Sequence, residues 1–288
     1  MSGRYLTELA GWLRAAGLEV VEVAGWPTRA RSSGGYSSGR PTCIMWHHTA
    51  SSVSWDGQRD ADYCATGDPD APLANLYLDR AGRVWILAAG ATNTNGKGGP
   101  VTVSRGQVPA DSMNSYAVGI EFGNNGVGET WPQAQIDAGF VTSTTLTARL
   151  GLDPGDVGTH TWWTTRKIDP ATATAVAGPW QPRSVNSSGS WSRDDLVAEC
   201  RRRATTPPAP TPEPEPEEDD MPQPLLVRNT AGSPFVIDAN VTGKFALWSE
   251  DWQALAATGQ YVVCEGMRDD TIDRIPTVGA PTDWREVP

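Results

Sequence analysis

A run of proline and acidic residues divides this chain of 288 residues into two unequal parts. Residues 205–221 read TTPPAPTPEPEPEEDDM, where proline alternates with small or acidic residues and then gives way to consecutive acids. Because proline removes backbone hydrogen-bond donors and like charges repel, we expect an extended, solvated linker here. The sequence therefore predicts a large domain over residues 1–204 and a small accessory domain over residues 222–288.

The part before the linker alternates between helical and strand patterns. Leu6, Leu9 and Leu13 recur at helical spacing, whereas the segment LEVVEV that follows them alternates as a strand does. Such interleaving predicts an α/β layered domain. The expected helices are residues 5–16, 132–150 and 192–203, and the expected strands are residues 18–23, 43–46, 75–79, 83–89 and 116–122, with 75–79 and 83–89 forming a hairpin.

The part after the linker has the pattern of a small α+β module. A helix is expected over residues 249–259, with Ser249 as its N-terminal cap and Gly259 at its end. The expected strands of this module are residues 225–229, 234–239, 244–248 and 261–265.

Charge and hydropathy exclude two classes of function. The net charge of −11 opposes binding to nucleic acid, whose phosphates require basic surfaces, and most of this charge lies after residue 204. No apolar run approaches the roughly 18–20 residues of a membrane-spanning helix, so no stable membrane insertion is expected. The first residues lack a secretory pattern, which predicts a soluble chain made in the cytoplasm. The four cysteines have no CxxC spacing and are expected to be reduced.

Two of the three histidines are adjacent. His47 and His48 follow the apolar segment CIMW at the end of a predicted strand. Because neighbouring strand side chains point to opposite faces, at most one of the pair should enter a given site. Their position alone is equally compatible with a polar strand end at the surface.

The third histidine lies close to a lysine and an aspartate. His160 belongs to the segment GTHTWWTTRKIDP, in which Lys167 and Asp169 stand two residues apart. The residue before proline is restricted to extended geometry, so these two side chains are expected to project to the same side. Two histidines and one aspartate match a catalytic zinc site, which has three protein ligands and a fourth position open to water. A purely structural His160 is the alternative.

A carboxylate interrupts the apolar strand YAVGIEF. Glu121 shares one face of this predicted strand with small residues, whereas Val118, Ile120 and Phe122 form the other. Burying an unpaired carboxylate is costly, so Glu121 is a candidate for the same site. The alternative is an edge strand that exposes Glu121 to solvent.

Three segments of the chain carry a family resemblance. CIMWHHTAS, AVGIEFGNNG and GTHTWWTTRKIDP, in this order, resemble the type 2 N-acetylmuramoyl-L-alanine amidases, which are relatives of the peptidoglycan recognition proteins and of many phage endolysins. The resemblance covers roughly residues 40–175, the core of a zinc amidase domain. It implies an α/β fold with a central mixed β-sheet flanked by helices.

The resemblance also implies a role for each candidate residue. By position, His47, His160 and Asp169 correspond to the Zn²⁺ ligands of the family, and Glu121 and Lys167 to its catalytic residues. His48 would then be a packing or supporting residue on the other face of the strand.

Two departures from the family pattern concern substrate contacts. Many members have a Tyr-His pair where this chain has Ala74 and Asn75, and their histidine-containing glycine loop is replaced here by residues 93–99. Asn75 and Asn95 are the candidate substrate-binding residues at these two places. Without the tyrosine, catalysis is expected to depend on Glu121 and Lys167.

The implied reaction is hydrolysis of the amide bond between N-acetylmuramic acid and L-alanine in peptidoglycan. Zinc would acidify a bound water, Glu121 would pass the water's proton to the leaving amine, and Lys167 would stabilise the oxyanion. One alternative is a recognition module that binds peptidoglycan without cleaving it, but all three ligands are present here. The other is a zinc peptidase acting on the stem peptide, which the lack of an HExxH segment disfavours.

The modular build implies a phage endolysin for host lysis. Such a protein would stay in the host cytoplasm until release, would need a separate membrane-permeabilising protein for export, and would then act on the cell wall. Trp248, Trp252 and Trp284 of the accessory domain either stack on wall sugars or belong to its core. The acidic balance of this domain favours a neutral glycan over a polyanionic polymer.

Overall fold

A computed structural model describes residues 4–37, 39–171 and 176–205, together with the backbone of four strands between residues 225 and 267. The chain forms two compact units, residues 1–209 and residues 210–288, which are described separately. The finer boundaries expected at residues 204 and 222 stay a prediction.

A six-stranded mixed sheet forms the centre of the first unit. Its strands stand in the order β1-β4-β3-β7-β2-β8, and all neighbours run parallel except the antiparallel pair β3 and β4. The predicted mixed sheet and the predicted hairpin are therefore confirmed. The bounds are β1 Val20–Glu22, β2 Cys43–His48, β3 Leu76–Leu78, β4 Val84–Ile86, β7 Ala117–Phe122 and β8 Val157–Thr159.

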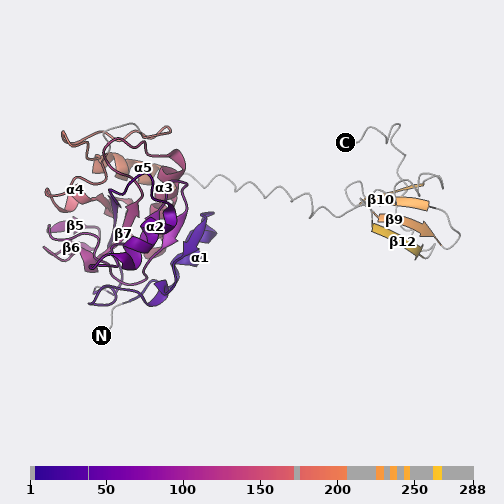
Figure 1. The fold of residues 1–288 in the computed structure, drawn as a ribbon, viewed down its shortest axis with the longest axis horizontal. Helices are drawn as coiled ribbons and strands as arrows, with labels where there is room; N and C mark the ends of the chain where they lie inside the picture. The colour runs from indigo at the N-terminus through magenta and orange to yellow at the C-terminus, as the bar shows by residue number, and fades with distance from the viewer. Residues whose placement is uncertain are drawn as a thin grey trace. The chain divides into compact units, whose positions relative to one another are not determined.

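Helices and short elements cover both faces of this sheet. On one face, α3 contacts both α1 and α5 (Figure 1) over the larger hydrophobic core. Two smaller clusters on the other face join the sheet to the hairpin of β5 and β6 and to the helical turns α2 and η2. The helical bounds are α1 Leu9–Ala15, η1 Trp26–Thr28, α2 Gly57–Asp62, η2 Tyr63–Gly67, η3 Met113–Ser115, α3 Gln133–Leu150, η4 Pro154–Asp156, α4 His160–Trp163 and α5 Arg193–Thr205; the hairpin strands are β5 Val101–Val103 and β6 Gly106–Val108.

Strand β2 shows how side-chain alternation divides the core. Trp46 is fully buried in the larger core, where its indole nitrogen donates to Ser143 of α3 at 2.8 Å. Met45, one residue earlier, lies in the cluster on the opposite face. His47 continues the face of Met45, and His48 continues the face of Trp46. The strand therefore extends two residues beyond the predicted range 43–46 and delivers the two histidines to different sides.

The second unit contains a four-stranded sheet in the order β11-β10-β9-β12. Its strands are β9 Leu225–Asn229, β10 Pro234–Asp238, β11 Gly243–Ala246 and β12 Val262–Met267, close to the four predicted ranges. The predicted helix over residues 249–259 and the three tryptophans of this unit lie outside the described residues. Among the helices that the structure describes, none has the length and apolar character needed to cross a membrane.

Candidate metal centre

The carboxyl ends of neighbouring strands bring the candidate residues together. In the register of the sheet, His47 on β2 stands beside Glu121 on β7. His160 follows directly after β8, the other neighbour of β2. Asp169 returns to this edge from the loop after α4, where its carbonyl accepts a hydrogen bond from the His160 amide at 3.0 Å. Paired positions on parallel strands share a face, so His47 and Glu121 point to the same side of the sheet.

Three potential ligand atoms converge on one point. The Nδ1 atoms of His47 and His160 lie 3.0 Å apart, and each lies 2.9 Å from Oδ2 of Asp169. The two histidines are buried and the aspartate nearly so, with 13% of its side chain exposed. Two imidazoles and a carboxylate form a donor set that zinc accepts, and three protein ligands leave a coordination position for water or substrate.

Asn95 determines which nitrogen of each imidazole faces this point. Nε2 of His160 donates to the backbone carbonyl of Asn95 at 3.0 Å, and Nε2 of His47 donates to the side-chain Oδ1 of Asn95 at 3.1 Å. An imidazole whose proton is on Nε2 has a lone pair on Nδ1. Two lone pairs and a carboxylate oxygen within about 3 Å of one another repel unless a cation or a shared proton lies between them. The residues present therefore fit a zinc ion.

The surroundings of His47 and Asp169 favour the ligand form of each. Burial lowers the pKa of His47, and the neighbouring His160 lowers it further, which favours the neutral imidazole. Burial alone would raise the pKa of Asp169, but hydrogen bonds and charges from His160 and His47 hold it well below its usual range. At neutral pH the site thus presents an ionised carboxylate and a neutral imidazole from His47.

Glu121 is a half-buried carboxylate that lacks a hydrogen-bond partner among the described residues. Its Oε2 atom is buried and forms no hydrogen bond with any residue that the structure describes. Burial raises the pKa of Glu121 well above its usual value; Asp169 adds to the increase and Lys167 opposes it. Strand β7 lies between β3 and β2, so the edge-strand alternative for Glu121 is wrong. Such costly, perturbed carboxylates are typical of active sites.

Lys167 lies on the same cleft as Glu121 and the ligand set. Its side chain is exposed, and no described residue forms a hydrogen bond or an ion pair with its ammonium group. Lys167 and Asp169 both line this cleft, as does Ile168 between them, so their expected projection to one side stays a prediction. A cation held beside a metal site can stabilise negative charge that develops on a substrate.

The cleft has a volume of about 830 Å³ and an apolar rim. Tyr63, Val127 and Ile168 line it with 41%, 76% and 41% of their surfaces exposed, although large apolar side chains are otherwise mostly buried in the described part of the chain. Exposed apolar side chains that gather around a groove mark a binding surface. Neither Tyr63 nor Val127 has a sequence signal, because both lie in segments without hydrophobic periodicity.

Three other predicted residues contact groups of the protein itself, although His48 also lines the cleft. His48 packs against Trp131 and accepts a hydrogen bond from the Ala171 amide at 3.3 Å, in agreement with a supporting role. Asn75 has no exposed surface; its side-chain amide donates to the carbonyls of Ala88 and Gly90, which follow β4, and accepts from the Gly119 amide of β7. Asn95 lies behind the ligands, 1% exposed. The positions of Asn75 and Asn95 thus differ from those expected of substrate-binding residues.

Replacing Asn95 with alanine is expected to weaken zinc binding by about 10–100-fold, the usual effect of removing an outer-shell partner of a metal ligand. The variant removes the acceptor for His47 but keeps the backbone carbonyl that orients His160. The measurement is competition for zinc against a chelator of known affinity. Asn93→Ala is the matched control, because Asn93 lies in the same loop and its side chain contacts Asp70 instead of the ligands. Equal affinities for Asn95→Ala and wild type would contradict this role.

Comparisons with known proteins agree with the resemblance found in the sequence. Residues 37–172 match the family model described as N-acetylmuramoyl-L-alanine amidase. A search of curated proteins gives no match.

Several solved structures are similar to the chain. One is the endolysin amidase LysCS from Clostridium intestinale URNW, with 16% identity over 51% of this chain and 84% of that chain, at a TM-score of 0.35. Another is AmiA from Staphylococcus aureus in complex with its ligand, with 16% identity over 71% and 93% of the two chains, at a TM-score of 0.41. A third is AmiD from E. coli in complex with the substrate anhydro-N-acetylmuramic acid-L-Ala-D-gamma-Glu-L-Lys, with 22% identity over 52% and 60%, at a TM-score of 0.37.

Proposed function

We propose that this chain, whose residues 37–172 match the N-acetylmuramoyl-L-alanine amidase family, is a zinc-dependent hydrolase of peptidoglycan. The bond cleaved is the amide between N-acetylmuramic acid and L-alanine. The observation that carries the proposal is that one cleft holds both the three-atom ligand set and the carboxylate of Glu121, whose Oε2 atom has no hydrogen-bond partner among the described residues. A protein that only bound peptidoglycan would have no use for a proton-transfer group beside the ligand set, so the combination favours hydrolysis.

His47, His160 and Asp169 would hold the metal, with Asn95 orienting both imidazoles. Zinc supplies Lewis-acid chemistry, which polarises an amide carbonyl and makes water nucleophilic at neutral pH. Because the three ligands are buried, solvent would screen the positive charge of the metal only weakly.

Glu121 moves the proton in the proposed reaction. Its free carboxylate oxygen takes a proton from the attacking water and delivers it to the nitrogen of the leaving alanine. The raised pKa of Glu121 suits this exchange, because the group holds the proton more readily than an exposed carboxylate does. The ammonium group of Lys167, in the same cleft, donates to the carbonyl oxygen as negative charge develops on it.

The biological setting of the proposal is that of a phage endolysin. The linker and the second unit give the chain the two-part organisation expected of such enzymes, with the second unit as the candidate wall-binding part. The protein would accumulate in the host cytoplasm and reach the wall with the help of a separate membrane-permeabilising protein.

Mass spectrometry of purified peptidoglycan tests the reaction. We expect the zinc-loaded protein to release stem peptides that begin with a free N-terminal alanine, and the chelated protein to release none. Intact peptidoglycan in both samples, with the protein still bound to it, would favour a recognition module instead. Fragments cut inside the stem peptide would identify a peptidase. Either of these two results would contradict the proposed function.

A further inference from the structure

Two loops contribute residues to the lining of the cleft. The first, residues 49–55, follows β2 and is called the β2 loop here; the second, residues 123–129, follows β7 and is called the β7 loop. Ser52 of the β2 loop and Val127 of the β7 loop both line the cleft. The strands that lead into these loops carry His47 and Glu121, so the loops adjoin the metal ligand and the proposed base.

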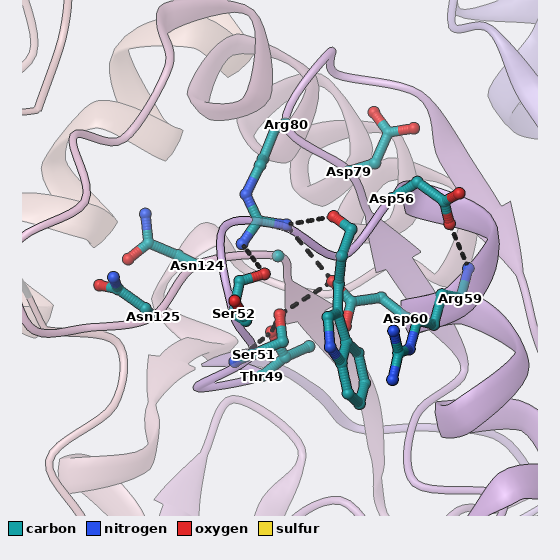
Figure 2. Close-up of polar contacts among 12 residues, drawn as sticks. Thr49, Ser51, Ser52, Asp56, Arg59, Asp60, Asp79, Arg80, Asn124 and Asn125 are labelled. Atoms are coloured by element: carbon teal, nitrogen blue, oxygen red, sulfur yellow. Dashed lines mark hydrogen bonds and ion pairs between the residues drawn. The ribbon is translucent and has the colours of Figure 1, made fainter.

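Arg80 connects the two loops from a third element, the turn between β3 and β4. Figure 2 shows its guanidinium between the backbone of the β2 loop and the carboxylate of Asp60. Its Nη2 donates to the carbonyl of Ser52 at 3.4 Å and its Nη1 to the carbonyl of Trp55 at 3.5 Å. The same guanidinium pairs with Glu129 of the β7 loop through Nε, and through Nη2 at 3.1 Å. One side chain thus contacts both loops at once.

The partner in the β7 loop also organises that loop. Oε2 of Glu129 accepts a hydrogen bond from the Asn125 amide at 2.8 Å. The side-chain Oδ1 of Asn125 in turn accepts from the amides of Val127, at 2.9 Å, and of Glu129, at 3.2 Å. Arg80 and Glu129 are only 21% and 11% exposed, so solvent screens this ion pair less than a surface pair.

Asp60 provides a second anchor on the side of the β2 loop. Its Oδ2 atom lies 3.4 Å from Nη1 of Arg80 and accepts hydrogen bonds from Ser51 and from Tyr77, each at 2.9 Å. Asp60 is 1% exposed, so this carboxylate is satisfied by protein groups and not by water. The β2 loop is therefore bonded to Asp60 of α2 as well as to Arg80, and Tyr77 of β3 holds Asp60 in place.

The β2 loop needs such external contacts. Ala50 within it has a φ of 54°, in the left-handed region that non-glycine residues rarely adopt. A residue in this region costs of order 1 kcal/mol or more and persists where surrounding contacts hold it. Contacts from outside the loop thus keep it in a conformation that the loop would not favour alone.

We propose that Arg80 is a positioning residue of the substrate cleft: its guanidinium holds the β2 loop and the β7 loop at the separation that admits substrate. The proposal deepens the function proposed above and rests on it only for the kinetic effect. Arg80 does not line the cleft and acts through the two loops. The planar fork of an arginine can serve several acceptors at fixed angles, which a lysine ammonium cannot do.

The expected size of the effect follows from the population of competent loops. Only molecules that hold both loops in the binding conformation can bind substrate. The apparent Kd is therefore the intrinsic Kd divided by the fraction of such molecules. If the loss of Arg80 leaves about a tenth of the molecules competent, KM rises about tenfold. The metal ligands and Glu121 do not touch Arg80, so kcat should change by less than about threefold, which is the signature of lost binding without lost chemistry.

The experiment compares Arg80→Met with Arg80→Lys and with a matched control, Arg83→Met. Arg83 lies in the same turn and pairs with Asp79 at 2.7 Å, but it contacts neither loop. Kinetics with a soluble muramoyl peptide should give a KM about tenfold higher for Arg80→Met, an intermediate KM for Arg80→Lys, and the wild-type KM for Arg83→Met. Zinc content should be equal in all four proteins.

Hydrogen exchange on the folded, full-length proteins tests whether Arg80 holds the two loops, and it does not require activity. In Arg80→Met, amides of the β2 loop and of the β7 loop should exchange faster together, while those of α3 stay protected; Arg83→Met should match wild type. If the wild-type protein hydrolyses no peptidoglycan, the proposed function is wrong. The hydrogen-exchange comparison still tests whether Arg80 holds the two loops. Unchanged exchange in either loop would overturn the proposal, as would a lower kcat at constant KM.

Discussion

Glu121→Gln is expected to lower kcat for amide hydrolysis by about 10²–10⁴-fold, the usual contribution of a general acid–base group. Glutamine has nearly the same shape as glutamate, so the cleft should remain intact. It cannot take a proton from water or return one to the leaving amine. The bound zinc should be unaffected, because Glu121 is not among the three converging ligand atoms.

Kinetics and metal analysis on the same preparation distinguish this account from a structural role for Glu121. The expected pair of results is a full complement of zinc and almost no turnover. A variant with near-normal turnover would show that another group moves the proton. A variant that had also lost its zinc would show that Glu121 supports the metal.

The same substitution should stabilise the metal-free protein at neutral pH. Burial raises the pKa of Glu121 in the folded state, so the folded chain holds a proton that the unfolded chain has already released. Stability from this group is thus lost as the pH rises from the ordinary glutamate pKa toward the raised value. Glutamine stays neutral, so the Tm of the chelated variant should exceed that of chelated wild type at pH 7 and equal it near pH 4.

Asp169→Asn is expected to cost more zinc affinity than the roughly 10–100-fold effect of losing an outer-shell partner. The substitution replaces an anionic ligand by a neutral amide and leaves His47 and His160 as two neutral ligands. Zinc at 1,000 times its Kd stabilises the wild type by about 4 kcal/mol, so the variant should lose most of the rise in Tm that zinc produces.

Asp156→Asn is the control for this variant. Asp156 is also a buried aspartate, 2% exposed, but its carboxylate bonds Ser104 and lies outside the cleft. It should lose stability with and without metal, and keep its affinity for zinc. The account of the ligand set would be wrong if Asp169→Asn bound zinc as tightly as Asp156→Asn does.

Long elements with clear periodicity could be predicted from the sequence. The helix expected over 132–150 is α3, Gln133–Leu150, and the strand expected over 116–122 is β7, Ala117–Phe122. The hairpin of β5 and β6 was not predicted, because it buries only Val101, Val103 and Val108 and so has too few apolar residues for a clear pattern. Helix α2 also lacks an apolar stripe: its sequence GQRDAD buries only Asp60 and Ala61. Tertiary contacts of these two side chains support the helix together with its N-terminal cap, in which Asp56 accepts a hydrogen bond from the Arg59 amide at 2.8 Å, and an apolar stripe reveals neither.

The candidate site could also be predicted only in part from the sequence. His47, Glu121, His160, Lys167 and Asp169 could be identified from residue type and spacing, and the structure gathers them on one cleft. Their convergence depends on the strand order β3-β7-β2-β8, which no local pattern encodes.

Asn95 and Arg80 act through geometry that a sequence does not display. The contact of Asn95 with His160 uses a backbone carbonyl, which every residue possesses. Arg80 stands at a hairpin turn, where a charged residue is ordinary. Asn75 was expected at the substrate because of its place in the chain, but its buried amide bonds only the protein interior.

Zinc titration of the chelated wild-type protein tests the central claim most directly. The measured quantity is the rate at which peptidoglycan releases stem peptides with a free N-terminal alanine, as zinc is added in sub-stoichiometric steps. We expect no release without metal, a linear rise with added zinc, and a plateau at one zinc per chain, because a single three-ligand site serves the reaction. Full release by the chelated protein, or zinc-dependent release of any other product, would contradict the account.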